Sequence, residues 1–121
     1  MQAFKVFHPR NGHLMTSIFH KKSAQGVEMG RYIFPVYGMF FVFDTLENAE
    51  RWTKRPLLRN MELQLWEVDS PEIHPITWEA VYPEHFDIFW TREDDECSIL
   101  VRRPPAGTRI VHAMQLLHQI W

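Results

Sequence analysis

Acidic and aromatic side chains crowd one stretch of the chain and are its most distinctive candidates for chemistry. All eleven Asp and Glu residues of the second half lie between Glu62 and Glu96, where Arg92 is the only Lys or Arg. We expect a negatively charged surface there that binds a basic surface on a partner protein, with a merely solvated charge run as the alternative. The residues expected to contact the partner are Glu84, Asp87, Trp90, Glu93, Asp94 and Asp95.

The aromatic side chains of that stretch have two alternative roles. Tyr82, Phe86, Phe89 and Trp90 surround two of the acids. If they are exposed, they would anchor an interface, because Trp and Tyr dominate binding hot spots. If they are buried, they complete the core.

Histidines are the next candidates for chemistry. His8 and His13 flank Asn11-Gly12, and His20 follows. Imidazoles bind Zn²⁺ and titrate near neutrality, but a zinc site needs three or four ligands. No Cys or Asp joins these histidines at short spacing, so we predict no metal site.

An enzyme is the alternative interpretation of the same region. His8 after a first strand, Tyr32 or Tyr37, and a strand-helix-strand order resemble fragments of the ADP-ribosyltransferase fold. The His-Gly-Thr opening and the acidic turn motif of that fold are missing. The resemblance implies a small NAD- or nucleotide-using enzyme with its site near His8. A concave pocket with convergent polar groups would distinguish it from a flat binding surface.

Nucleophile and cofactor motifs are missing from the chain. The single cysteine, Cys97, follows the acidic residues 93–96, whose charge disfavours a reactive thiolate. A Gly-rich phosphate loop, a Gly-x-Ser-x-Gly elbow and a Cys-x-x-Cys pair are all lacking. We therefore expect no catalytic residue and no cofactor, and favour a protein that is not an enzyme.

Length and composition indicate one domain over residues 1–121, with 14% aromatic residues to build a core. One cysteine excludes an intrachain disulfide and favours the reducing cytoplasm. No segment approaches the roughly 20 apolar residues that span a bilayer, so no membrane contact is expected.

The formal net charge of −2 conceals an asymmetry. Residues 1–60 carry nine Lys or Arg against four Asp or Glu, whereas residues 61–121 carry four against eleven. Nucleic-acid-binding proteins are normally basic or carry a cationic cluster. The balance argues against direct nucleic-acid binding.

The elements that must position these residues are most clearly marked at residues 39–55. Met39 to Phe43 form an apolar run of strand length, and we predict a central strand. A helix from about Thr45 to Arg55 follows, because Leu46, Ala49 and Trp52 recur at helical spacing. Asp44 or Thr45 is its expected N-cap, and Pro56 ends it.

Strand signals dominate the remaining chain. Alternating patterns predict strands at residues 3–7 and 61–68, and Asn11-Gly12 predicts a hairpin to a strand at 14–19. Weaker signals lie at residues 31–36, 76–82, 86–91 and 98–102, with a turn at 104–107. We expect Trp52 and Trp66 to be buried in one core, although alternation puts Trp66 opposite Leu63 and Leu65.

The C-terminal segment, residues 108–121, fits two alternatives. Val111, Met114, Leu117 and Trp121 have helical spacing, whereas Arg109 to Val111 is consistent with the start of a strand. The predicted fold class is α+β, a mostly antiparallel sheet with one short internal helix at about 45–55 and a C-terminal helix as the open alternative.

The order of these motifs resembles a diffuse family of small uncharacterised phage and prokaryotic proteins. The family pattern has a Lys-Val-type first strand, Gly-Leu-x-Ser, a Gly-x-Phe-Val-Phe-Asp-x-Leu-Glu-Asn-Ala core and a late Pro-x-Gly-Thr. These correspond to residues 5–6, 12–17, 38–49 and 105–108. The resemblance implies a phage or mobile-element accessory protein, located in the host cell cytoplasm if it is phage-encoded, and assigns no catalytic residue. Together with the charge pattern, it predicts a non-enzymatic protein that binds a host protein.

Overall fold

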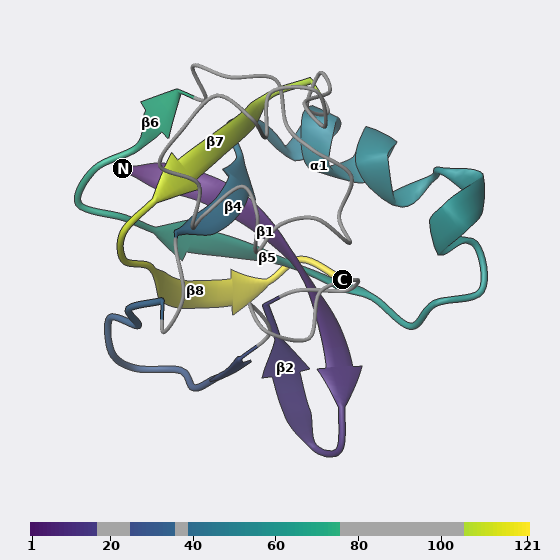
Figure 1. Cartoon of the computed structure of the whole chain (residues 1–121), viewed down its shortest axis with the longest axis horizontal. Coiled ribbons are helices and arrows are strands. Elements are labelled where there is room, and N and C mark those ends of the chain that lie inside the picture. Colours follow the sequence, from purple (N-terminus) through teal and green to yellow (C-terminus); the bar gives the residue numbers. More distant parts are fainter. Residues whose placement is uncertain (17–24, 36–38, 76–105) are drawn as a thin grey trace, which may run out of the picture.

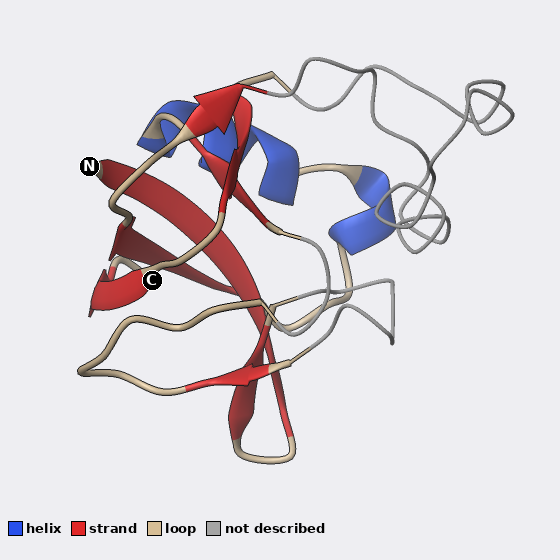
Figure 2. Ribbon diagram, turned by 60° about the vertical axis from the view of Figure 1, so that its left-hand side comes forward, coloured by secondary structure: helices blue, strands red, loops and turns tan. Residues whose placement is uncertain are grey.

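The computed structural model describes residues 1–16, 25–35, 39–75 and 106–121, and it has an α+β fold, as predicted. Within these residues a mostly antiparallel sheet of eight strands carries one short α-helix (Figures 1 and 2). The elements are β1 (Gln2–Arg10), β2 (His13–Met15), β3 (Gly26–Val27), β4 (Phe40–Phe43), α1 (Leu46–Thr53), the 3₁₀ turn η1 (Pro56–Leu58), β5 (Gln64–Asp69), β6 (His74–Pro75), β7 (Thr108–Val111) and β8 (Gln115–Gln119). In the parts of the chain that are described, no helix is long and apolar enough to cross a membrane.

β1 is the strand around which the sheet is organised. One edge pairs with β5 along residues 2–7, while the other pairs with β4 at Phe4 and with β2 at residues 8–10. The hairpin to β2 turns at Asn11 and Gly12, which have φ angles of 52° and 80°. Two positive φ values define the type I′ turn that the right-handed twist of paired strands favours. The predicted hairpin is therefore confirmed.

The sheet must be rolled to connect β7 with β8. β4, β1 and β5 lie between these two strands in the hydrogen-bond order, yet only residues 112–114 join them along the chain. In a flat sheet, four strand spacings would separate β7 from β8 by about 19 Å. The path from Val111 to Gln115 reaches at most about 14 Å when extended. The rolled sheet brings the end of β7 to the start of β8, as Figure 1 shows.

The two faces of the sheet bury two separate apolar clusters. The face away from α1 holds the larger cluster: Ala3, Phe7, Val27, Phe40, Val42, Trp66, Val68, Val111, Met114 and Leu116. The face under α1 buries Val6, Phe43, Ala49 and Leu65. β5 therefore contributes side chains to both clusters, and its adjacent residues Leu65 and Trp66 are both buried because each face is covered.

The expectation that Trp52 and Trp66 share one core is wrong. Trp66 is 7% exposed and belongs to the larger cluster. Trp52, a residue of the helix, is half-buried and packs against Phe43 of the smaller cluster. Alternation along β5 had already assigned Trp66 to the face opposite Leu65. The helix covers only the Leu65 face, so the two indoles lie on opposite sides of the sheet.

α1 begins where the sequence predicts, with Thr45 as its N-cap. The Thr45 hydroxyl accepts a hydrogen bond from the Asn48 amide at 3.1 Å, which satisfies one otherwise unpaired donor of the first turn. Asp44, the other candidate, instead accepts from the Asn48 side chain at 2.9 Å. The helix ends at Thr53, two residues before the predicted end.

The C-terminal segment is strand, so the helical alternative is wrong. β7 pairs with β4 and β8 pairs with β5, and these partners supply the backbone hydrogen bonds that a helix would have made internally. The register of β8 shifts opposite Glu67 and Val68, so Leu117 is an extra residue in the ladder. This bulge lets Leu116 face the larger cluster while Ile120 packs under α1.

Candidate interaction site

The six residues predicted to contact a partner lie outside the described residues. Glu84, Asp87, Trp90, Glu93, Asp94 and Asp95 all fall within 76–105, as do Cys97 and the strands expected at 76–82, 86–91 and 98–102. The acidic binding surface therefore stays a prediction. Among the described residues, the candidate site is formed by residues 25–35.

Residues 25–35, here called the apolar segment, present large side chains to solvent. Met29 is 60% exposed, Tyr32 40% and Phe34 66%. They account for half of the large exposed apolar side chains in the described part of the chain; the others are Met1, Leu117 and Trp121. Exposed apolar side chains gathered on one segment are characteristic of interaction surfaces.

The apolar segment is held to the body of the protein by backbone pairing. Ile33 and Met114 exchange two backbone hydrogen bonds, of 2.7 and 3.0 Å, in an isolated antiparallel bridge. Met114 is fully buried, and the half-buried Ile33 packs against its cluster. The Gln25 side chain also donates to the Phe34 carbonyl oxygen at 3.0 Å. Met29 and Phe34 are thus exposed to solvent, while Val27 and Ile33 of the same segment pack into the larger cluster.

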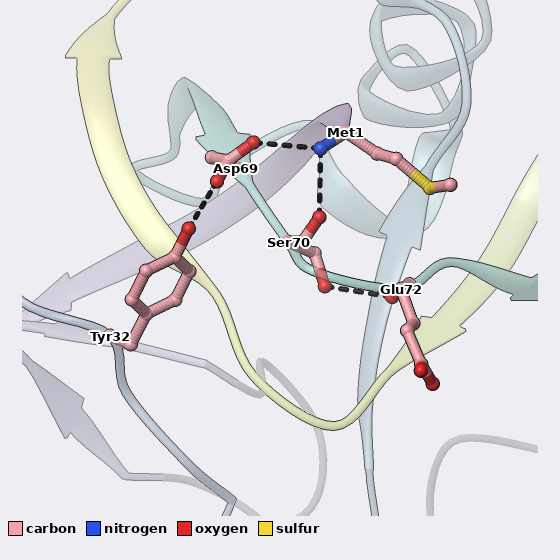
Figure 3. A network of polar contacts seen from close by, with 5 residues as sticks. All are labelled: Met1, Tyr32, Asp69, Ser70 and Glu72. Carbon is pink, nitrogen blue, oxygen red and sulfur yellow. Dashed lines mark hydrogen bonds and ion pairs between the residues drawn. The ribbon is translucent and has the colours of Figure 1, made fainter.

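A polar network fixes Tyr32 at the end of β5 (Figure 3). Its hydroxyl donates to one carboxylate oxygen of Asp69, and the α-ammonium of Met1 donates to the other at 2.8 Å. The same ammonium donates to the Ser70 carbonyl oxygen at 2.8 Å. The buried Ser70 donates its hydroxyl to the Glu72 carbonyl oxygen at 2.8 Å. The ring of Tyr32 is thereby held in one orientation while it remains partly exposed.

The electrostatics of this network follow from its two donors. The ammonium of Met1 and the hydroxyl of Tyr32 stabilise the ionised carboxylate, which lowers the pKa of Asp69. Conversely, the hydrogen bond to Asp69 raises the pKa of the Tyr32 phenol, with smaller contributions from desolvation and the nearby negative charge. Tyr32 therefore stays protonated and keeps donating at neutral pH.

Sequence reasoning missed the apolar segment because it predicted a strand at residues 31–36. The strand expected at residues 31–36 is wrong for the residues described: only Ile33 pairs, in a single bridge. Apolar side chains between Gly26, Gly30 and Pro35 were the available signal, because turn-forming residues around large apolar ones indicate an exposed loop. Their exposure depends on the pairing with Met114, which lies about 80 residues away in the sequence.

The histidines do not assemble a metal site in the described ranges. His8 Nδ1 lies 3.0 Å from the Glu62 carbonyl oxygen, and no cluster of three or more His, Cys, Asp or Glu there could hold a metal ion. His74 contacts the Glu72 carboxylate at 3.1 Å and the edge of His112 at 5.7 Å between ring centroids. Tyr32, a residue of the enzyme interpretation, is hydrogen-bonded to Asp69, and Tyr37 lies outside the described residues.

Lys5 is a buried titratable residue that the sequence analysis did not single out. Its side chain shares the strand face of Ala3 and Phe7, is 6% exposed, and donates to the Phe41 carbonyl oxygen at 2.6 Å. Burial lowers its pKa to about 7. β1 and β4 are paired only at Phe4 and Phe43. The hydrogen bond from the Lys5 side chain to Phe41 therefore adds a second connection between the two strands. The side-chain nitrogen is shielded from solvent, and its role is structural.

Two motifs of the sequence pattern meet beside the start of α1. Asp44 accepts from Asn48 at 2.9 Å and from the Arg109 guanidinium at 3.3 Å, and its amide donates to the Gly107 carbonyl oxygen at 2.9 Å. Gly107 has a φ of 81°, and a Cβ there would lie 2.3 Å from Asp44 Oδ1. These contacts tie the helix to β7, which is a structural role.

Comparison of the chain with protein-family models, with curated proteins and with solved structures finds no match in any of the three. In the apolar segment, exposed apolar side chains occur on a backbone that is hydrogen-bonded to the body of the protein. This combination suits contact with another macromolecule.

Proposed function

We propose that this protein is a non-enzymatic binding protein, a phage or mobile-element accessory protein that engages a host protein through its apolar segment. The observation that carries the proposal is the pair Met29 and Phe34, each at least 60% exposed on a segment bridged to the core. Contact of such apolar side chains with water is unfavourable in the free protein. Burying them in a protein interface would remove that contact and so favour binding.

The firm attachment of the segment supports a binding role on energetic grounds. A loop that orders only on binding loses conformational entropy at that moment, which weakens affinity. The Ile33–Met114 bridge and the Tyr32–Asp69 hydrogen bond order the segment beforehand. Large apolar and aromatic side chains presented in this way act as interface anchors.

The acidic stretch contributes a second part of the proposal. The carboxylates of Glu93, Asp94 and Asp95, which the sequence predicts to lie on the surface, would attract a basic surface on the partner and accelerate association. In this scheme the apolar segment supplies most of the affinity, because exposed charge pairs each contribute only about 0.2–1 kcal/mol.

The test is affinity capture from host lysate, followed by mass spectrometry, with matched variants. Met29→Ser combined with Phe34→Ser removes both anchors from the apolar segment. Leu117→Ser combined with Trp121→Ser removes two other exposed apolar side chains, 39% and 44% exposed, and is the control. Thermal melting checks that both variants remain folded.

A host protein retained by the wild type and by the control, but lost from the Met29/Phe34 variant, is the expected result. The dissociation constant measured with that purified protein should then rise at least about tenfold in the variant, because two partly buried anchors are removed. Equal capture by both variants would refute the apolar segment as the binding surface.

A further inference from the structure

A second exposed surface lies at the end of α1 and is strongly basic. It consists of Arg51, Lys54, Arg55 and Arg59, here called the basic surface. All four side chains are exposed, and no Asp or Glu lies between Glu50 and Glu62. In Figure 1, η1 lies at the right-hand periphery beyond the end of α1, well away from the β1–β2 hairpin.

Helix geometry places two of these cations on the solvent face. Ala49 is fully buried and marks the face that packs on the sheet. At 100° per residue, Arg51 and the C-cap residue Lys54 point roughly 140–200° away from Ala49. They therefore share the outward side of the helix, and Arg55 and Arg59 flank η1 directly after it.

Only one of the four cations has an acidic partner among the residues described. Arg51 forms an ion pair with Glu47 at 2.9 Å, whereas Lys54, Arg55 and Arg59 have none. A cation at a helix C-terminus gains about 0.3–1 kcal/mol from the helix dipole, which accounts for Arg51 and Lys54. It does not account for Arg59, which lies beyond α1 and continues the positive surface.

We propose that the basic surface binds an acidic protein segment, a run of Asp and Glu residues on a partner. Exposed, neighbouring cations, three of them without an acidic partner among the described residues, are complementary to such a run and would hold it through charge-assisted hydrogen bonds. This contact goes beyond the proposed function, because it involves a different surface with different chemistry and does not depend on the apolar segment.

An acidic peptide suits this surface better than a nucleic acid does. Single-stranded nucleic acid is held by cations together with exposed aromatic rings on which bases stack. The aromatic residue of this helix, Trp52, is half-buried and packs against Phe43 at 5.6 Å between ring centroids.

The experiment measures binding of a fluorescent deca-glutamate peptide to the full chain by anisotropy at low salt. Single-stranded dT11, which carries ten phosphates, is the competing probe. Lys54→Glu combined with Arg59→Glu reverses half of the basic surface. Arg10→Glu combined with His112→Glu and Gln119→Glu changes the net charge equally at exposed positions elsewhere and is the control.

The peptide should bind the wild type and the control with similar affinity. It should bind the Lys54/Arg59 variant at least about tenfold more weakly, because two attractive contacts become repulsive. Raising the salt concentration should weaken the binding of the wild type. Equal weakening in both variants would overturn the proposal, since net charge alone would then explain it. Tighter binding of dT11, or salt-sensitive self-association of the chain without peptide, would overturn it in favour of nucleic acid or of a second copy.

Discussion

Asp44 and Gly107 lie directly against each other, at the point where the start of the helix meets the start of the C-terminal strands. The Asp44 amide donates to the Gly107 carbonyl oxygen at 2.9 Å, and a Cβ on Gly107 would lie 2.3 Å from Asp44 Oδ1 and from Asn48 Nδ2. Residues more than 60 positions apart are thus joined by backbone and side-chain contacts together. The absence of a side chain at Gly107 is what allows both.

Gly107→Ala should lower the free energy of unfolding by more than Gly12→Ala does. Both glycines have φ near 80°, which costs an L-residue about 1–2 kcal/mol, but nothing lies within 4 Å of a Cβ at Gly12. The additional loss at Gly107 comes from displacing Asp44 and Asn48. Urea denaturation of the two variants measures the difference, and equal losses would show that the contact with Asp44 has no energetic consequence.

Thr45→Ala should destabilise the protein by about 0.5–2 kcal/mol, because the Asn48 amide loses its hydrogen-bond acceptor at the start of α1. Thr45→Ser keeps the hydroxyl and is the matched control. Chemical denaturation should place the serine variant close to the wild type. If the alanine and serine variants were equally stable, the capping bond would not contribute.

Lys5→Met should remove a pH dependence of stability between about pH 7 and pH 10. The folded-state pKa of Lys5 is about 7, below the ordinary 10.5, so in this range the unfolded chain binds a proton that the folded chain does not. Wild-type stability should therefore rise with pH by roughly 1 kcal/mol per unit from this residue. Below pH 7 the folded state holds a buried ammonium, and the methionine variant should be the more stable protein.

The difference in unfolding free energy between wild type and Lys5→Met, measured at pH 6, 7.5 and 9, isolates this residue from the other groups that titrate. It should shrink as pH rises. A constant difference would contradict the lowered pKa of Lys5.

Asp69→Asn should lower the pKa of the Tyr32 phenol toward its ordinary value of 10.0. The carboxylate raises that pKa chiefly by accepting the phenol hydrogen bond, and the amide carries no negative charge. NMR titration of the tyrosine ring carbons follows Tyr32, which Tyr32→Phe identifies by the loss of one resonance. An unchanged Tyr32 pKa would mean that the bond to Asp69 is not formed in solution.

The same network should loosen in acid. The pKa of Asp69 is lowered in the folded state, so its contribution is present above the ordinary pKa of 3.8 and is lost as pH falls through the folded value.

Reversing Glu93, Asp94 and Asp95 to Lys should slow association with a captured partner far more than it alters the melting temperature. Exposed charges steer encounters through long-range attraction, and they contribute little to folding. Stopped-flow association rates at low and high salt measure the effect, which should diminish as salt screens the charges. An unchanged rate at low salt would leave the acidic run as ordinary solvated surface.

Short-range signals determined those parts of the fold whose hydrogen bonds are local. Asn11-Gly12 specifies its hairpin because both residues tolerate positive φ, and Thr45 with the apolar stripe behind it specifies α1. Alternation assigned Leu65 and Trp66 to opposite faces of β5. Neighbouring residues supply the physical cause in each case, so the sequence is sufficient.

The tertiary structure alone decided the elements whose partners are distant. Residues 108–121 have helical spacing, yet they are strands because β4 and β5 provide their hydrogen bonds. The exposure of Met29 and Phe34 likewise follows from the bridge between Ile33 and Met114, which no pattern within residues 25–35 could indicate. Periodicity reports which side chains share a face, whereas pairing across the rolled sheet determines which of those faces are covered.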